Sequence, residues 1–167
     1  FHLGVNEATG VIEAAEITKN DVADSEALES LLDQIKRPIN QVSADGAYDK
    51  RSCYDALRAR GITKVTIPPQ HNARIWRHGN SKQERLARDE NLRRIREIGR
   101  KAWKEESDYH RRSIDETTMF RFKTIFGDGV SARNWAGQRM ELLLKCRILN
   151  QLTDLGMPQT EVVEVVV

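Results

Sequence analysis

Residues 109–123 read YHRRSIDETTMFRFK, and this stretch indicates the fold more strongly than any other part of the chain. It places Tyr109, Arg112, Glu116 and Lys123 with two, three and six residues between them. On an α-helix, at about 100° per residue, the last three fall within roughly 60° of the tyrosine and form a polar stripe about 21 Å long. Arginine and lysine bind phosphate oxygens, glutamate binds divalent cations, and tyrosine stacks on bases. The stretch is therefore a candidate phosphodiester-binding helix, with an ordinary solvated helix face as the alternative.

This spacing resembles the signature around the last acid of bacterial insertion-sequence DDE transposases. Neighbouring segments are similar to the same family, namely residues 72–76 (NARIW), 78–81 (HGNS), 99–104 (GRKAWK) and 126–128 (FGD). The resemblance extends from residue 2 to residue 158, which is nearly the whole chain. It implies an α/β fold, a ribonuclease-H-like mixed sheet with flanking helices.

The pattern of apolar residues predicts the order of the elements. In order, we expect a hairpin of strands at 2–5 and 11–17, a helix from Asp24 or Ser25 to Ile35, a strand at 39–44, a helix at 50–60, a strand at 62–67, a basic helix at 82–103, the motif helix from residue 109 and a last helix at 133–155. This order resembles the ribonuclease-H-like fold with its first, aspartate-bearing strand absent. We expect residues 1–158 to be a partial catalytic domain with a basic helical insertion at about 70–105, and residues 159–167 to be a tail.

The resemblance implies a site of three carboxylates that holds two Mg²⁺ or Mn²⁺ ions. By local pattern Asp45 matches the second acid and Glu116 the third, so both are expected to be catalytic and to bind the metal ions. Tyr109, Arg112 and Lys123 are expected to contact DNA. In the family the first acid lies on a strand upstream of the hairpin. The chain is thus expected to be a C-terminal fragment, inactive alone and poorly folded, because that strand lies in the middle of the sheet.

Four other side chains receive weaker interpretations. Asp115 lies about 100° around the helix from Glu116 and is expected to point away from the site. Asp49 is expected to cap the helix that follows it. Cys53 and Cys146 show no spacing typical of a disulfide or a metal site, so both are expected to be buried small side chains.

The net charge of +2 conceals a strong asymmetry. Residues 1–50 hold four Lys/Arg and ten Asp/Glu, whereas residues 51–150 hold twenty-three and twelve. A basic half of this kind indicates a polyanionic partner, or else a solvated helical segment. The candidate phosphate contacts are Arg93, Arg94, Arg96, Arg100, Lys101 and Lys104, and the candidate stacking residues are Trp76, His78 and Trp103. For the two tryptophans, packing in the core is the favoured alternative.

The sequence thus predicts the catalytic-core fragment of a DNA transposase, which in complete form cleaves and transfers DNA strands at insertion-sequence ends. Two alternatives stay open, a non-catalytic basic fragment that binds DNA or a transposase, and a related ribonuclease-H-like nuclease. The resemblance implies DNA as partner, both transposon ends and target, and a homo-oligomer for the full-length protein. No run of eighteen apolar residues and no basic-then-apolar leader occurs, so we expect no membrane partner and a cytoplasmic, nucleoid-associated location.

Overall fold

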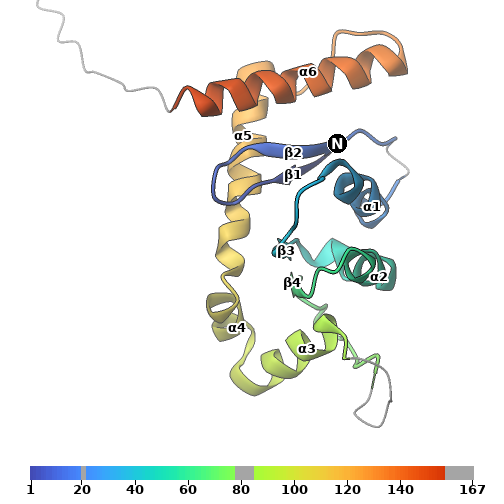
Figure 1. Cartoon of the computed structure of the whole chain (residues 1–167), viewed down its shortest axis with the longest axis vertical. Coiled ribbons are helices and arrows are strands. Elements are labelled where there is room, and N and C mark those ends of the chain that lie inside the picture. The colour runs from blue at the N-terminus through green and yellow to red at the C-terminus, as the bar shows by residue number, and fades with distance from the viewer. Residues whose placement is uncertain (20–21, 78–84, 157–167) are drawn as a thin grey trace, which may run out of the picture.

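The structure is a computed structural model that describes residues 1–19, 22–77 and 85–156. The chain opens with β1 (His2–Val5) and β2 (Ile12–Glu16), which pair antiparallel as the predicted hairpin. Helix α1 (Asp24–Gln34) follows and lies against both strands (Figure 1). The N-cap of α1 is Ala23, which makes no side-chain cap bond. Asp24 and Ser25 are the first two residues of the helix and do not cap it.

A strand–helix–strand unit follows, as predicted. Strand β3 (Gln41–Ser43) leads through the 3₁₀ turn η1 (Gly46–Tyr48) and helix α2 (Arg51–Ala59) to β4 (Lys64–Thr66). The two strands pair in parallel, with Val42 opposite Val65. Because parallel neighbours end at the same edge of a sheet, the segments after β3 and β4 emerge side by side.

The second half of the chain is helical. It contains α3 (Ala87–Ile98), α4 (Arg100–Glu106), the 3₁₀ turn η2 (Tyr109–Arg112), α5 (Ser113–Phe126) and α6 (Trp135–Asp154). The prediction of one helix at 82–103 is wrong, since Gly99 adopts a φ of 85° and separates α3 from α4. Only glycine adopts such a backbone readily, so the chain turns there. Residues 82–84 of that prediction and the tail at 159–167 lie outside the described residues.

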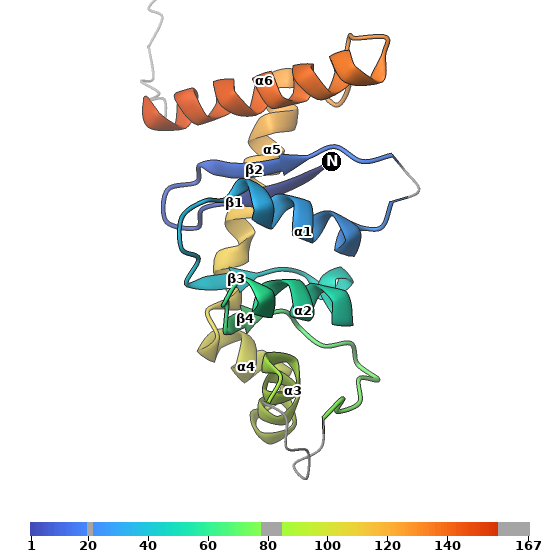
Figure 2. The ribbon, with the colours of Figure 1, turned by 45° about the vertical axis from the view of Figure 1, so that its right-hand side comes forward.

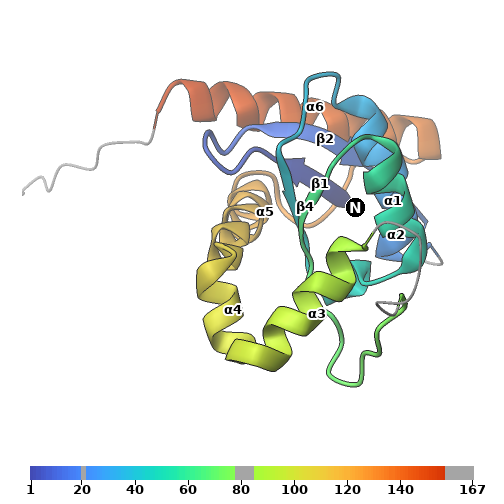
Figure 3. The ribbon, with the colours of Figure 1, turned by 60° about the horizontal axis from the view of Figure 1, so that its bottom comes forward.

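The helices lie on two sides of the strands. Figure 3 shows α1 and α2 on one side, while α5 and α4 lie on the other and α3 continues their arc. Helix α6 crosses the end of the molecule above the hairpin (Figure 2). Asn150 on α6 fixes this crossing, because its side chain bonds both the N–H and the carbonyl of Ile12, at 2.8 and 2.9 Å.

Two hydrophobic clusters form the core. The first joins α1, α2, β4 and their connections, and its members Leu57 and Ile67 are fully buried. The second joins the hairpin to α5 and α6 through Phe122, Cys146 and Leu149. In α6, Cys146 and Leu149 are buried, whereas Leu152 near its end is 37% exposed.

The mixed α/β architecture is confirmed, but the strands do not form one sheet. Within the described residues β1 bonds only β2, and β3 bonds only β4. A cavity of about 680 Å³, the inter-sheet cavity, is lined by β1, β3, α1 and the first part of α5. The outer backbone edges of β1 and β3 are therefore not joined to each other in this structure.

Candidate active site

Asp45 lies at the carboxyl end of β3. The parallel pairing extends one residue past the strand, because Ala44 donates its N–H to the Thr66 carbonyl at 3.2 Å. Asp45 then caps η1, with its Oδ1 accepting the Ala47 N–H at 2.8 Å. Its side chain also lines the inter-sheet cavity. A carboxylate at a strand end, fixed by one backbone bond, keeps its remaining lone pairs for a ligand.

Tyr109 and Arg112 lie in η2 rather than in the motif helix itself, so the prediction of a single helix from residue 109 is wrong. They still face each other, with the guanidinium carbon of Arg112 5.5 Å from the centre of the tyrosine ring. Burial raises the pKa of Tyr109, while Arg112 opposes that shift. The phenol therefore stays protonated at neutral pH and can donate a hydrogen bond.

Glu116 lies in the first turn of α5 and forms an ion pair with Arg112 one turn earlier. Its side chain is 63% exposed, so a ligand from solvent reaches it freely. Asp45 and Arg112 both line the inter-sheet cavity. The structure thus brings four of the five predicted site residues together: Asp45, Tyr109, Arg112 and Glu116.

Lys123, the fifth, lies apart from this group. It lies seven positions after Glu116 in the sequence, which is about 10 Å along α5. Its Nζ lies 3.6 Å from Asp128 Oδ1, beyond the end of the helix. A role for Lys123 in DNA contact remains a prediction, and any such contact lies further along the helix than the Arg112–Glu116 pair.

Asp115 is the residue whose placement the sequence did not indicate. It lines the inter-sheet cavity together with Asp45, and its buried Oδ1 has no hydrogen-bond partner in the described structure. Burial raises the pKa of Asp115, with Arg112 lowering it and the Glu116 and Asp45 carboxylates raising it further. Asp115 does lie about 100° around α5 from Glu116, and in this direction it lines the cavity.

The carboxylates are hard oxygen ligands, which suit Mg²⁺ or Mn²⁺. The described residues contain no group of three His, Cys, Asp or Glu side chains able to hold a metal ion. Asp45 and Glu116 have carboxylate oxygens of the kind that such an ion prefers.

The family model described as a transposase DDE domain matches residues 1–151 of the chain. The chain belongs to the DDE transposase family. The resemblance noted in the sequence is therefore confirmed, and transposase function and DNA as substrate follow at the level of the family. No solved structure matches the chain. Within the described residues no helix has the length and apolar character needed to cross a membrane.

Most arginines of the transposase's basic segment form hydrogen bonds or ion pairs within the domain. Arg94 pairs with Glu97 and Glu106, and three other arginines donate to backbone carbonyls of residues 69–77. Those three are Arg93, Arg96 and Arg100. These four guanidiniums are thus already hydrogen-bonded, which weakens their candidacy as phosphate contacts. Lys101 and Lys104 are exposed, with Lys104 lying 5.0 Å from the Tyr109 ring.

The favoured packing role of the two tryptophans agrees with the structure. Trp103 is 2% exposed and Trp76 packs edge-on against Tyr54, whereas His78 lies outside the described residues. The prediction that Asp49 caps α2 is wrong, because Lys50 is the N-cap and Asp49 is buried against an arginine of α3. Both cysteines are buried and free, as predicted.

Proposed function

We propose that this domain is the catalytic core that cleaves DNA at insertion-sequence ends and joins it to target DNA, on a ribonuclease-H-like fold. The observation that supports this most strongly is that Asp45 and Arg112 line the same edge of the inter-sheet cavity, where Arg112 pairs with Glu116 and faces Tyr109. Phosphodiester transfer needs oxygen ligands for divalent ions beside cationic groups for phosphate. This edge carries both kinds of group.

Asp45 and Glu116 are the proposed ligands for Mg²⁺ or Mn²⁺. Two such ions, when bound, stabilise the attacking and leaving oxygens of an in-line displacement. Arg112 is placed to move its guanidinium from Glu116 to a phosphate oxygen, and Tyr109 to stack on a base or donate from its hydroxyl. Lys123 contacts the DNA backbone further along α5.

The third carboxylate, we propose, arrives on a strand that occupies the inter-sheet cavity between β1 and β3. Each of these strands has one bonded neighbour in the described structure, and a strand edge without a partner is unfavourable once buried. Residues 1–158 would then be part of the catalytic domain, with 70–105 as an insertion. Without that strand the chain is expected to be inactive.

The proposed partners are transposon ends, target DNA and further copies of the transposase. An apolar stripe along α6 supports self-association, since its side chains recur at helical spacing and are exposed. They are Met140, Leu144, Ile148, Leu152 and Leu155, between 37% and 83% exposed. Exposed apolar stripes of this length commonly mark interfaces. The proposed location is the cytoplasm, at the nucleoid.

Nicking of supercoiled plasmid in Mg²⁺ or Mn²⁺ tests the proposal. The assay compares this chain with a form extended upstream through one more strand, each also carrying Asp45→Ala or Glu116→Ala. Asp55→Ala and Glu105→Ala, on exposed faces of α2 and α4, are the matched controls. We expect nicking only in the extended form, lost in either site variant and retained in both controls.

Activity of the short chain would contradict the need for a third acid. Nicking that survives both site substitutions would contradict the assignment of Asp45 and Glu116. The incomplete carboxylate set of the described residues favours one alternative, a non-catalytic fragment that binds DNA or a transposase. Salt-sensitive DNA binding without nicking in either form would support that alternative.

A further inference from the structure

Residues 69–77, the clamped loop, leave β4 at the same edge as Asp45. A Cβ placed on Gly46 would lie 3.5 Å from the Pro68 carbonyl oxygen, so the loop begins beside the turn that Asp45 caps. Asp49, at the end of that turn, accepts the Gln70 N–H through its Oδ2 at 3.1 Å. The loop is therefore joined directly to the segment that carries the catalytic aspartate.

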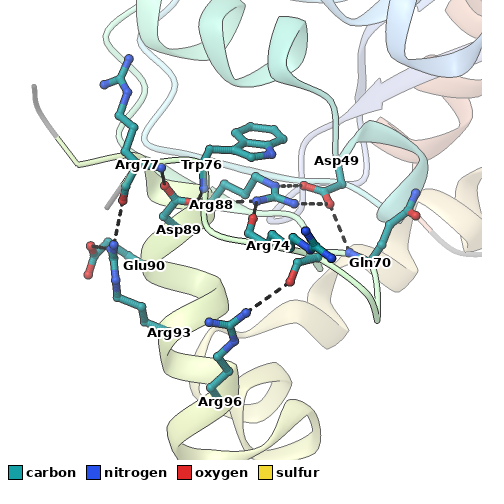
Figure 4. Close-up of polar contacts among 11 residues, drawn as sticks. Asp49, Gln70, Arg74, Trp76, Arg77, Arg88, Asp89, Glu90, Arg93 and Arg96 are labelled. Atoms are coloured by element: carbon teal, nitrogen blue, oxygen red, sulfur yellow. Dashed lines mark hydrogen bonds and ion pairs between the residues drawn. The ribbon is translucent and has the colours of Figure 1, made fainter. Parts of the chain in front are cut away.

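Side chains of α3 hold the backbone of the clamped loop (Figure 4), and one side chain of α4 holds its first residue. Four arginines donate to its carbonyls: Arg100 to Pro69 at 2.7 Å, Arg96 to Ala73 at 3.3 Å, Arg88 to Arg74 at 2.8 Å and Arg93 to Arg77 at 3.0 Å. Asp89, fully buried, accepts the N–H groups of Trp76 and Arg77 at 2.9 and 2.8 Å. Such bonds fix the loop's conformation before any ligand binds.

Arg88 is the centre of this arrangement. It is 4% exposed, and its Nε lies 2.7 Å from Asp49 Oδ1. Its guanidinium carbon lies 3.7 Å from the centre of the Trp76 ring, so one side chain ties α3, the loop and the end of η1 together. Figure 4 shows Arg88 reaching across from α3 to Asp49. A buried arginine with ionic, carbonyl and aromatic partners holds its neighbours in one geometry.

The side chains of the same loop are left exposed. Gln70, His71, Asn72 and Arg74 are all solvent-accessible, and none of these side chains has a hydrogen bond or ion pair within the described structure. Lys50 and Arg51, which follow Asp49 in the chain, are also exposed, and the Arg51 guanidinium carbon lies 5.4 Å from the centre of the Trp76 ring. A rigid backbone that presents polar and cationic side chains without internal partners is suited to binding a polyanion.

We propose that the clamped loop contacts the DNA strand that enters the site at Asp45, with Arg74 on a phosphate and His71 and Asn72 on the neighbouring sugar or base edge. This inference rests on the proposed function, because it takes the DNA at Asp45 as its ligand. The internal arginines position the loop, and the exposed Arg74 makes the contact. The arginines of α3 and α4 thus contribute to DNA binding chiefly by fixing the conformation of the clamped loop.

The first measurement is binding of the full chain to a fluorescein-labelled duplex by anisotropy, at several salt concentrations. Arg74→Ala is compared with Arg139→Ala, which removes an arginine that is also exposed and has no hydrogen bond or ion pair among the described residues; it belongs to α6, at the other end of the molecule (Figure 1). We expect Arg74→Ala to weaken binding roughly tenfold and to reduce the salt slope by about one. Arg139→Ala should change binding by about twofold or less.

Photocrosslinking distinguishes direct contact with DNA from a long-range electrostatic effect on binding. Asn72→Cys can be labelled selectively with a photoactivatable reagent, because Cys53 and Cys146 are buried and burial raises the pKa of both thiols, that of Cys146 to about 11. We expect DNA crosslinks from position 72 and none from Arg139→Cys.

If the parent chain binds DNA while Arg74→Ala behaves like Arg139→Ala and position 72 gives no crosslink, the loop proposal is wrong and the proposed function stands. If the parent chain binds no DNA at all, both fail.

Discussion

The clamped loop and the inter-sheet cavity lie on either side of β3 and differ in how their charged groups are paired. Next to the loop, Arg88 forms ion pairs with Asp49 and Asp89 and donates to the Arg74 carbonyl, all within the domain. In the cavity, Asp115 has a buried oxygen with no hydrogen-bond partner among the described residues, and within this part of the chain β1 and β3 each lack a bonded strand on the cavity side. The first region is complete in this chain. The second has the properties of a surface that another element covers.

The largest effect is expected from Arg88→Met, which tests the completeness of the first region. The substitution leaves Asp49 and Asp89 buried without their cation, so the free energy of unfolding should fall by about 3–5 kcal/mol. Urea unfolding followed by circular dichroism measures it. Arg94→Met, which removes an arginine paired only at the surface, is the control and should have a far smaller effect. Equal losses in the two variants would mean that the cluster around Arg88 is not a buried, interdependent unit.

Asp115→Asn tests the second region and should act in the opposite direction. Removing a buried, unpaired charge while keeping the shape should raise the free energy of unfolding by about 1 kcal/mol at neutral pH. The thermal midpoint of the variant should rise accordingly. Asp55→Asn, on an exposed face of α2, serves as the control and should leave the midpoint almost unchanged. A clear loss of stability in Asp115→Asn would show that the carboxylate already has a partner.

Glu141 is a counterpart of Asp89 at the surface, because the carboxylate of each residue accepts two backbone N–H groups. Its carboxylate accepts the N–H groups of Ser131 and Ala132. The bond from Lys145 is the largest cause of its lowered pKa, and together with the two backbone bonds it holds the pKa of Glu141 at about 2. A lowered pKa stabilises the fold above the ordinary carboxyl pKa, and this stability is lost as pH falls toward 2.

Glu141→Gln should therefore lower the thermal midpoint slightly at pH 7, and the difference from the parent chain should vanish on acidification. Thermal unfolding at a series of pH values measures this. A difference that persists or grows at low pH would contradict the role of the ionised carboxylate.

The sequence predicted the order and approximate bounds of the elements well, because apolar periodicity is local. The same periodicity missed the turn at Gly99, where one residue with a positive φ divides a stretch of otherwise helical pattern. It also missed the pairing of Asp49 with Arg88, which lie 39 residues apart and have no local relation. Contacts of this range depend on how the elements pack.

The site was predicted by a different route. Asp45 and Glu116 were identified by resemblance, and in the structure Arg112 lies between them, since it lines the same cavity as Asp45 and pairs with Glu116. A helical wheel gave the angle of Asp115 correctly but not what lies in that direction. The cavity on that side of α5 arises from two separate sheets, and no local pattern indicates it.

Hydrogen–deuterium exchange of the short chain and the upstream-extended form tests most directly whether the inter-sheet cavity is a place for one more strand. We predict that the extension slows exchange of the amides in β1 and β3, while the Trp76 and Arg77 amides, already bonded to Asp89, exchange equally slowly in both forms. Equal exchange of β1 and β3 in the two forms would contradict that claim.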